Sequence, residues 1–192
     1  MFNRIALIFA LVSPLCFSQV LSNTPSALVG EVFQATATAP NIEVAFSPDA
    51  GAEALVLKVI NSAQQSIRLA GYSFTSPAVV KALMDSKRRG VDVQVVIDDK
   101  GNRGKASSAA MNLIMGADIP LRVVSVYAIH HDKYIVVDDR HTETGSFNFS
   151  QAAAKSNSEN FLVIWNNPEV ANRYLMHWEN RWKQGVEVER SY

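Results

Sequence analysis

The sequence has very little cysteine: its 192 residues contain one, Cys16. A disulfide framework is therefore excluded, and the stability of the fold must come from a hydrophobic core. An excess of charge of one sign is also missing, because 18 Lys and Arg residues balance 18 Asp and Glu residues. Bulk charge therefore gives no sign of a nucleic-acid partner, and any anion-binding site has to be local.

No apolar run is long enough to cross a bilayer comfortably. The longest, residues 5–17, follows Arg4 and precedes small and polar residues, which is the layout of a secretory signal peptide. We expect a signal peptide over residues 1–22, with the cleavage site not fixed, and a periplasmic or secreted protein without stable membrane association. The alternative is an uncleaved membrane anchor. Residues 23–40, rich in Ala, Thr, Ser and Pro, are expected to form a flexible lead-in to a catalytic domain over residues 41–192.

Strand and helix patterns alternate after this lead-in. Ser76 followed by Pro77 is typical of a helix start, and Gly90 ends that helix. Strands are expected at 42–46, 66–72, 91–97, 121–126, 133–137 and 160–165, with further helices at 52–65, 105–115 and 168–183. The pattern predicts a single α/β domain, in which a mixed β-sheet is sandwiched between helices.

The most informative stretch runs from His131 to Asn148. Side chains two apart on an extended strand share a face, so His131 projects with Lys133, and Ser146 with Asn148. Gly145, just before the second pair, permits a close backbone approach. An imidazole can act as a nucleophile or an acid near neutral pH, and the other three groups are donors suited to phosphoryl oxygens.

The spacing His131-x-Lys133-x4-Asp138-x6-Gly145-Ser146-x-Asn148 matches the HxK(x)4D(x)6GSxN motif of the phospholipase D superfamily without a mismatch. The resemblance extends over residues 42–184, and it includes a strand–helix–strand unit at 72–99. A short exported chain with one motif looks most like the bacterial single-motif endonucleases, which are described as EDTA-resistant. The resemblance implies a phospholipase D-like fold and a metal-independent phosphodiesterase without a cofactor.

Residue roles follow from the resemblance. It implies that His131 attacks phosphorus and forms a phosphohistidine intermediate. Lys133 and Asn148 would bind the non-bridging oxygens, and Ser146 would hydrogen-bond the phosphate or order the site. Glu159 stands where the family often places an acidic residue that orients the histidine, which would fix its tautomer.

Two further positions are assigned by strand parity. Asp138 lies seven residues from His131 and so has the opposite parity, which favours a structural role near the site over a phosphate contact. His130 points to the other face from His131 and is expected to be structural. A metal site of His130 with Asp132 or His141 is disfavoured, because adjacent strand residues diverge and no HxH or HExxH spacing occurs.

The reaction needs two histidines in opposite protonation states, whereas the chain carries one motif. The simplest solution is a homodimer that places both copies of His131 across one phosphate. We therefore expect a twofold dimer.

Residues 81–105 have a local excess of positive charge, because this stretch contains seven basic residues and four acidic ones. One interpretation is that three cations complement the dipole at a helix C-terminus: Lys87, Arg88 and Arg89. The other is that they join Lys100, Arg103 and Lys105 in a patch that contacts a nucleic-acid backbone. The expected substrate is DNA, with RNA as a further candidate. On the last helix, His177 is expected at the surface or in packing, and Trp178 and Trp182 in the core.

Two alternatives remain open. A phospholipase or cardiolipin hydrolase would use the same chemistry, but it needs an apolar entrance, and the sequence after the signal shows no exposed amphipathic helix. A catalytically silent nucleic-acid-binding module would keep the fold alone, and the intact set of His131, Lys133 and Asn148 argues against it.

Overall fold

The computed structural model describes residues 41–188. The expected signal peptide and lead-in, residues 1–40, lie outside the described residues and stay predictions. No helix of the described part is long and apolar enough to cross a membrane.

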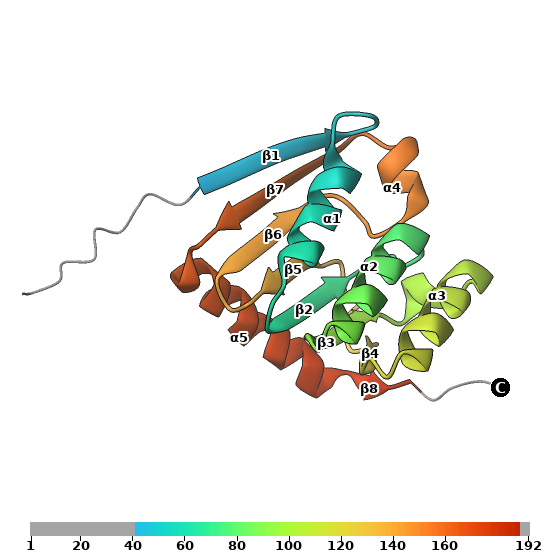
Figure 1. The fold of residues 1–192 in the computed structure, drawn as a ribbon. Helices are drawn as coiled ribbons and strands as arrows, with labels where there is room; N and C mark the ends of the chain where they lie inside the picture. The colour runs from blue at the N-terminus through green and yellow to red at the C-terminus, as the bar shows by residue number, and fades with distance from the viewer. Residues whose placement is uncertain (1–40, 189–192) are drawn as a thin grey trace, which may run out of the picture. The chain divides into compact units, whose positions relative to one another are not determined.

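A single eight-stranded sheet organises the domain, with the strand order β1-β7-β6-β5-β2-β3-β4-β8 (Figure 1). The strands are β1 Asn41–Ser47, β2 Ser66–Gly71, β3 Asp92–Asp98, β4 Leu121–Val124, β5 Lys133–Val137, β6 His141–Gly145, β7 Glu159–Trp165 and β8 Val186–Glu187. The helices are α1 Ala52–Ser62, α2 Pro77–Arg88, α3 Lys105–Gly116, α4 Gln151–Lys155 and α5 Pro168–Gln184, with a 3₁₀ turn at Lys100–Asn102. β2, β3 and β4 are parallel to one another, and the remaining pairs are antiparallel. The prediction of a mixed sheet in one domain is confirmed.

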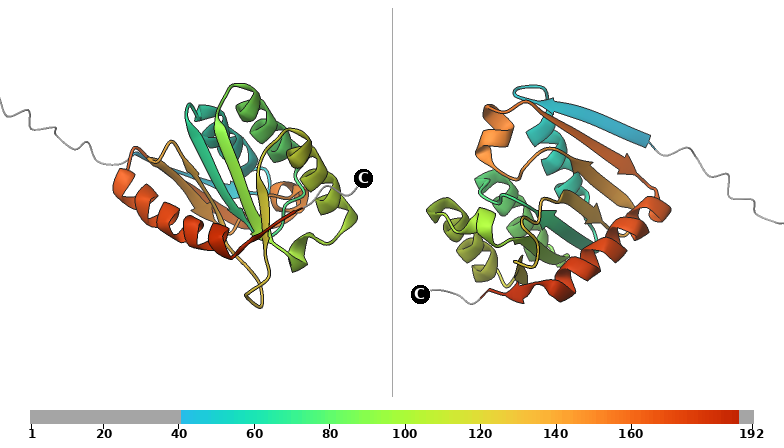
Figure 2. Two further views of the ribbon diagram at one scale, coloured as in Figure 1. Left: turned by 90° about the horizontal axis from the view of Figure 1, so that it is seen from below. Right: turned by 180° about the vertical axis from the view of Figure 1, so that it is seen from behind.

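Helices cover both faces of the sheet, as the prediction required. α1, α2 and α3 lie on one face and α5 crosses the other (Figures 1 and 2). On the α5 side, Trp178 is buried and its Nε1 donates to the carbonyl of Leu69 at 2.9 Å. Trp182, half-buried, stacks on Trp178 with 4.9 Å between ring centroids. Both tryptophans therefore pack against the sheet, as expected.

Three elements were not expected from the sequence: β6, α4 and β8. β6 has the sequence HTETG, which contains no aliphatic residue, so a search for apolar alternation passes over it. β4 ends at Val124, two residues earlier than expected, and the loop that follows projects from the layers (Figure 2).

The strand register brings the carboxyl ends of β2, β3 and β6 to the same edge of the sheet as the amino ends of β5 and β7. Gly71 pairs with Lys133, and Gly145 pairs with Phe161. At the opposite edge, the Asp138 N–H donates to the carbonyl of Ser66, where β2 begins. The motif residues therefore divide between two edges of the sheet.

Candidate active site

His131 lies in the β4–β5 loop, two residues before β5 begins, and its side chain is exposed. Its ring packs edge-on against Tyr72 with 4.7 Å between centroids, and within residues 41–188 it makes no hydrogen bond. The loop is anchored one residue earlier, where the His130 N–H donates to the buried carboxylate of Asp98 at 2.6 Å. The imidazole is thus held by its backbone while both ring nitrogens stay open to a substrate.

Lys133 begins β5 and is 7% exposed. Its Nζ donates to the carbonyl of His131 at 2.9 Å and lies 5.4 Å from the centroid of the Tyr72 ring. Burial lowers the pKa of the Lys133 ammonium, and the carboxylates of Glu159 and Asp132 offset part of that shift. This ammonium is short of counter-charge, a favourable state for binding a phosphate.

Ser146 and Glu159 form a second pair at the same edge. The Ser146 Oγ donates to Glu159 Oε2 at 2.5 Å, and Asn157 Nδ2 donates to Oε1 at 3.0 Å. The hydrogen bonds of the Glu159 carboxylate within the described part of the chain therefore go to these two residues and not to His131. Within this chain Glu159 orients Ser146, a partner that the sequence did not predict for it.

Asn148 lies on the same side of the chain as Ser146, as expected from the sequence, although β6 ends at Gly145. Ser146 and Asn148 are half-buried, whereas Phe147 and Phe149 between and after them are buried. Asn148 Oδ1 is buried and has no hydrogen-bond partner among residues 41–188. A phosphodiester oxygen can only accept, so the part of the Asn148 carboxamide that could bind it is the Nδ2 amide, which donates, and not this Oδ1.

A pocket of about 450 Å³ adjoins His131 and Lys133 on the α5 side of the sheet. Asp132, Tyr134, Thr144 and Gly145 continue its floor from the central strands. The wall comes from α5, through Arg173, Tyr174 and His177. The sequence reasoning missed these α5 residues as site residues. Two stripes run along α5 at a spacing of four residues. The polar stripe is Arg173, His177 and Arg181, and the aromatic stripe beside it is Tyr174, Trp178 and Trp182. The polar stripe could have indicated a second functional face of this helix.

The other three histidines are engaged elsewhere. His177 Nδ1 lies 2.8 Å from the Tyr134 hydroxyl, and Nε2 lies 2.8 Å from the Arg181 guanidinium. Because a guanidinium can only donate, Nε2 must accept; burial and Arg181 both lower the pKa of His177. His130 is buried, with its Nε2 2.8 Å from Asp132. His141 Nδ1 accepts from the Asn166 N–H at the opposite edge.

Asp138 lies at the edge away from His131. Its carboxylate accepts hydrogen bonds from the backbone N–H groups of Gln64, Gln65 and Ser66, between α1 and β2. Its own backbone is left-handed, with φ 51°. Asp138 therefore fixes a connection in the fold, which fits the structural role that parity favoured. The expectation that it lies near the site is wrong, because it lies at the opposite edge of the sheet.

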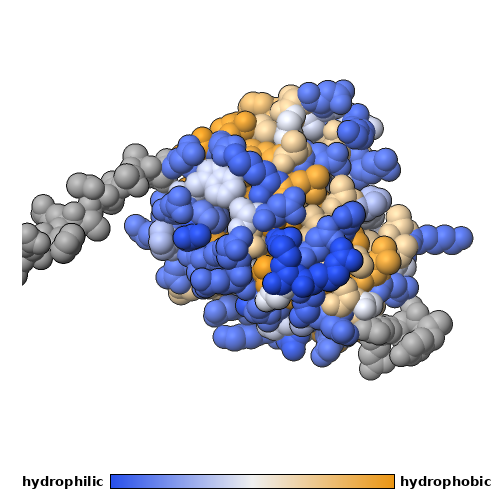
Figure 3. Space-filling model, viewed as in Figure 1, coloured by the Kyte–Doolittle hydropathy of each residue, from blue (hydrophilic) through white to orange (hydrophobic). Residues whose placement is uncertain are grey.

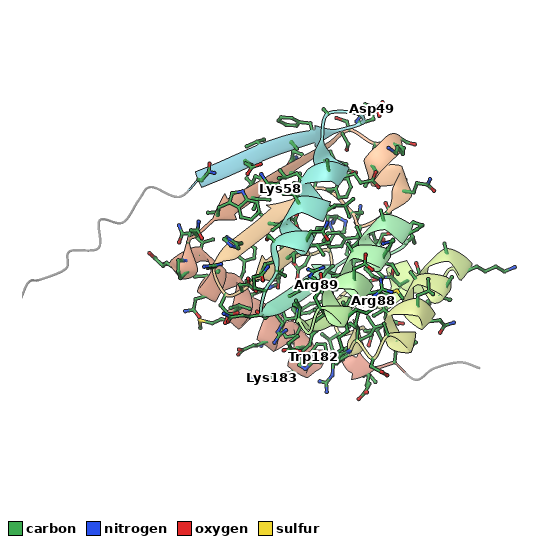
Figure 4. All side chains as sticks on the ribbon, viewed as in Figure 1. Asp49, Lys58, Arg88, Arg89, Trp182 and Lys183 are labelled. Atoms are coloured by element: carbon green, nitrogen blue, oxygen red, sulfur yellow. The ribbon has the colours of Figure 1, made fainter. Side chains whose placement is uncertain are left out.

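The basic stretch does not form the continuous patch considered from the sequence. Arg89 donates to carbonyls of Asn61 and Ala63, at the edge where β2 and β3 begin. Figures 3 and 4 show Arg88 and Arg89 as a strongly hydrophilic area in the middle of the face that α1 and α2 cover. Arg103, paired with Asp99 at 2.5 Å, and the exposed Lys105 follow β3 at the edge that carries His131. The length of β3 separates the two groups.

No group of three His, Cys, Asp or Glu side chains that could hold a metal ion occurs within residues 41–188. The buried ammonium of Lys133 beside His131 suits an anion.

Comparison with known proteins agrees with the fold and the motif. The family model described as "Cardiolipin synthase, PLD-like domain" matches residues 56–182. Phospholipase D of Rickettsia bellii is 30% identical over 84% of this chain and 79% of its own length. Human mitochondrial cardiolipin hydrolase is 29% identical over 79% of this chain and 62% of its own length. The crystal structure of Nuc, a phospholipase D family member from Salmonella typhimurium, is 52% identical over 79% of this chain and 99% of Nuc, with a TM-score of 0.78.

NucT from Helicobacter pylori shares the fold with a TM-score of 0.63 at 22% identity. The matched family model spans most of the described domain and includes the whole motif from His131 to Asn148. The chain is therefore a phosphodiesterase that belongs to the phospholipase D superfamily.

Proposed function

We propose that this protein is a metal-independent endonuclease that hydrolyses DNA, and RNA as a further substrate, through a phosphohistidine intermediate. The observation that carries the proposal is His131, whose exposed and unbonded imidazole stands beside the buried ammonium of Lys133 at the mouth of a pocket. A nucleophile next to a fixed positive charge is suited to attack on a phosphodiester.

The first step forms a bond between a ring nitrogen of His131 and phosphorus, and it breaks the bond from phosphorus to the leaving oxygen. The leaving oxygen takes a proton from a second imidazolium. Lys133 and the Asn148 Nδ2 amide bind the non-bridging oxygens as their charge grows. The Ser146 hydroxyl donates to Glu159, so Ser146 orders the site. The second imidazole, now neutral, then takes a proton from a water molecule, and the oxygen of that water attacks phosphorus. The new phosphorus–oxygen bond replaces the phosphorus–nitrogen bond and regenerates His131.

The second imidazole is proposed to be His131 of another copy of this chain. The remaining histidines are poor candidates, because His177 uses both ring nitrogens, His130 is buried and His141 lies at the far edge. A twofold dimer brings two equivalent imidazoles to one phosphate, and the substrate makes them unequal.

The nucleic-acid substrate is supported by the similarity to Nuc, which this chain matches over 99% of the Nuc structure at 52% identity. The pocket beside His131 adds to it, since its lining is polar and aromatic.

The test is cleavage of plasmid DNA by the mature protein in excess EDTA. Wild type should nick the plasmid, and His131→Ala should lose at least about 10³-fold in rate, because the nucleophile is removed. Folding and DNA binding should persist in this variant. Lys58→Ala, at an exposed lysine of α1, is the matched control and should retain the rate. Cleavage that persists in His131→Ala would rule out the mechanism.

A phospholipase is the second candidate, and one feature of the structure favours it. Val126 and Ile129, 61% and 47% exposed, lie on the projecting β4–β5 loop just before His131. The sequence predicted no exposed amphipathic helix, and these two side chains instead form an exposed apolar surface on the loop that leads to His131. Relatives named phospholipase D and mitochondrial cardiolipin hydrolase accord with it. Phosphatidic acid release from cardiolipin vesicles, measured beside plasmid nicking at equal enzyme concentration, decides between the two substrates.

A further inference from the structure

We propose that the α5 wall of the pocket is a nucleoside-binding subsite, in which Tyr174 and His177 contact the base or sugar next to the scissile phosphate and Arg173 contacts the following phosphate. The inference rests on the proposed endonuclease function, and it names the residues of the same site that select a polynucleotide.

The pocket is continuous with the reacting groups. His131 and Lys133 line one end of it, and Arg173, Tyr174 and His177 line the α5 side. Its volume of about 450 Å³ leaves room for a substrate group next to the phosphate. A phosphodiester held at His131 would therefore extend one of its two substituents along α5.

The chemistry of the lining favours a nucleoside over an acyl chain. The lining contains imidazole, phenol, ammonium, guanidinium, carboxylate and hydroxyl groups, and no Leu, Ile, Val, Met or Phe. An acyl chain would bury its methylenes against polar groups there, at a cost in free energy. Aromatic rings, by contrast, stack on any base, because every base has a π-face.

The aromatic groups of the wall are held in place before a ligand binds. The His177 ring is bonded at both nitrogens, to Tyr134 and Arg181. Tyr174 packs edge-on against Tyr134 with 4.9 Å between ring centroids, and the Tyr134 ring is buried. A ring that is already ordered loses little conformational entropy on binding, so it makes an effective stacking surface.

Arg173 differs from the other α5 cations in its position and freedom. It lines the pocket, and its side chain is 78% exposed, with Glu169 as an ion-pair partner at 3.3 Å. An exposed pair within one helix contributes little stability, so a phosphate can replace the carboxylate at small cost. Arg181 instead is bonded to His177 and to Tyr127.

The experiment compares two substrates for the same catalytic groups. An oligothymidylate places a nucleoside on each side of the phosphate, whereas bis(p-nitrophenyl) phosphate has none. The measured quantity is the ratio of kcat/KM for the oligonucleotide to kcat/KM for the small diester. Tyr174→Leu keeps an apolar contact with Tyr134 but removes the π-face, and it should lower the ratio about tenfold. Tyr174→Phe keeps the ring and should retain the ratio.

Arg173→Ala should lower the ratio as well, and it should reduce the slope of log KM against log salt by about one, the loss of one phosphate contact. Lys183→Ala removes a cation from the C-terminal end of the same helix, near Trp182 in Figure 4, and should leave both quantities as in wild type. Thermal unfolding of each variant confirms that it is folded.

Each remaining outcome is decisive. A ratio that stays at the wild-type value in Tyr174→Leu and Arg173→Ala, with an active wild type, would overturn the subsite and leave the endonuclease proposal standing. A wild type that hydrolyses the small diester but not the oligonucleotide would overturn the endonuclease proposal itself. If the two variants lose activity on cardiolipin vesicles instead, the wall binds a lipid headgroup and the nucleoside assignment is wrong.

Discussion

At the scale of single residues, Glu143 is unusual because it is an ionisable side chain buried in the middle of the sheet. It lies in the middle of β6, between Ile135 and Val163 of the neighbouring strands. Its side chain is buried, and neither carboxyl oxygen has a hydrogen-bond partner within residues 41–188. Burial raises the pKa of the Glu143 carboxyl well above its ordinary value, which favours the neutral form in the folded protein.

Glu143 should make the domain less stable as the pH rises. The unfolded chain releases this proton near pH 4.3, whereas the folded chain retains it, so the free energy of unfolding falls by up to about 1.4 kcal/mol per pH unit above that point, until the pH reaches the folded pKa. Glu143→Gln replaces the titratable carboxyl with a neutral amide. The variant should therefore have a higher free energy of unfolding than wild type at pH 8 but not at pH 4. Urea unfolding at several pH values measures this.

The control is the same substitution at the exposed Glu179. Parallel stability curves for wild type and Glu143→Gln across this pH range would contradict the buried, protonated carboxyl.

Asp138 should matter to stability and not to turnover. Burial alone would raise the pKa of its carboxyl, but three backbone N–H groups hold that pKa below its ordinary value. The charged form therefore stabilises the fold above about pH 4, and this stability is lost as the pH falls through the folded pKa. Asp138→Ala should cost about 2 kcal/mol at pH 7, through lost hydrogen bonds and a left-handed backbone that alanine disfavours.

The plasmid assay and urea unfolding, run on the same preparation of Asp138→Ala, separate the two roles. A folded variant with wild-type stability and no turnover would place Asp138 in the chemistry.

At the scale of elements, α2 shows a boundary that the sequence predicted and the structure confirms. Ser76 accepts from the Val79 N–H at 3.3 Å, and Pro77 is the first helical residue. Ser76→Ala should cost about 1 kcal/mol, because it leaves a helix N–H without its partner. Thermal unfolding measures this, with Ser108→Ala in the exposed first turn of α3 as the comparison. A loss no larger than that of Ser108→Ala would show that the cap contributes nothing.

β6 is a strand that the sequence pattern did not predict. Apolar periodicity found β5 and β7 because each buries aliphatic side chains, whereas the HTETG strand is held by its two neighbours. Strand parity still paired His131 with Lys133 and separated Asp138 from them, because parity depends on local geometry. The Glu159–Ser146 bond and the α5 wall depend on tertiary contacts between distant segments, which no local pattern encodes.

At the scale of the whole molecule, the described domain offers one exposed imidazole with unbonded ring nitrogens, that of His131, whereas the proposed mechanism needs two imidazoles. Three of its four histidines are buried, bonded or distant, as described above. The loop before His131 exposes Val126 and Ile129, and apolar side chains of this kind are suited to burial against another surface. A second copy that meets the first near this loop would complete the site and cover the loop together.

The proposed dimer makes a quantitative prediction for mixtures of wild-type and variant chains. Wild-type and His131→Ala chains, co-expressed with different affinity tags, yield a mixed species that two successive affinity steps isolate. If one site uses both copies of His131, this species should have less than about a hundredth of the wild-type rate, because either the nucleophile or the acid is missing. A mixed species of wild type with Glu179→Gln, purified in the same way, should retain the full rate. Half the wild-type rate in the first species would mean that each chain works alone, and the acid would then have to be sought within the single subunit.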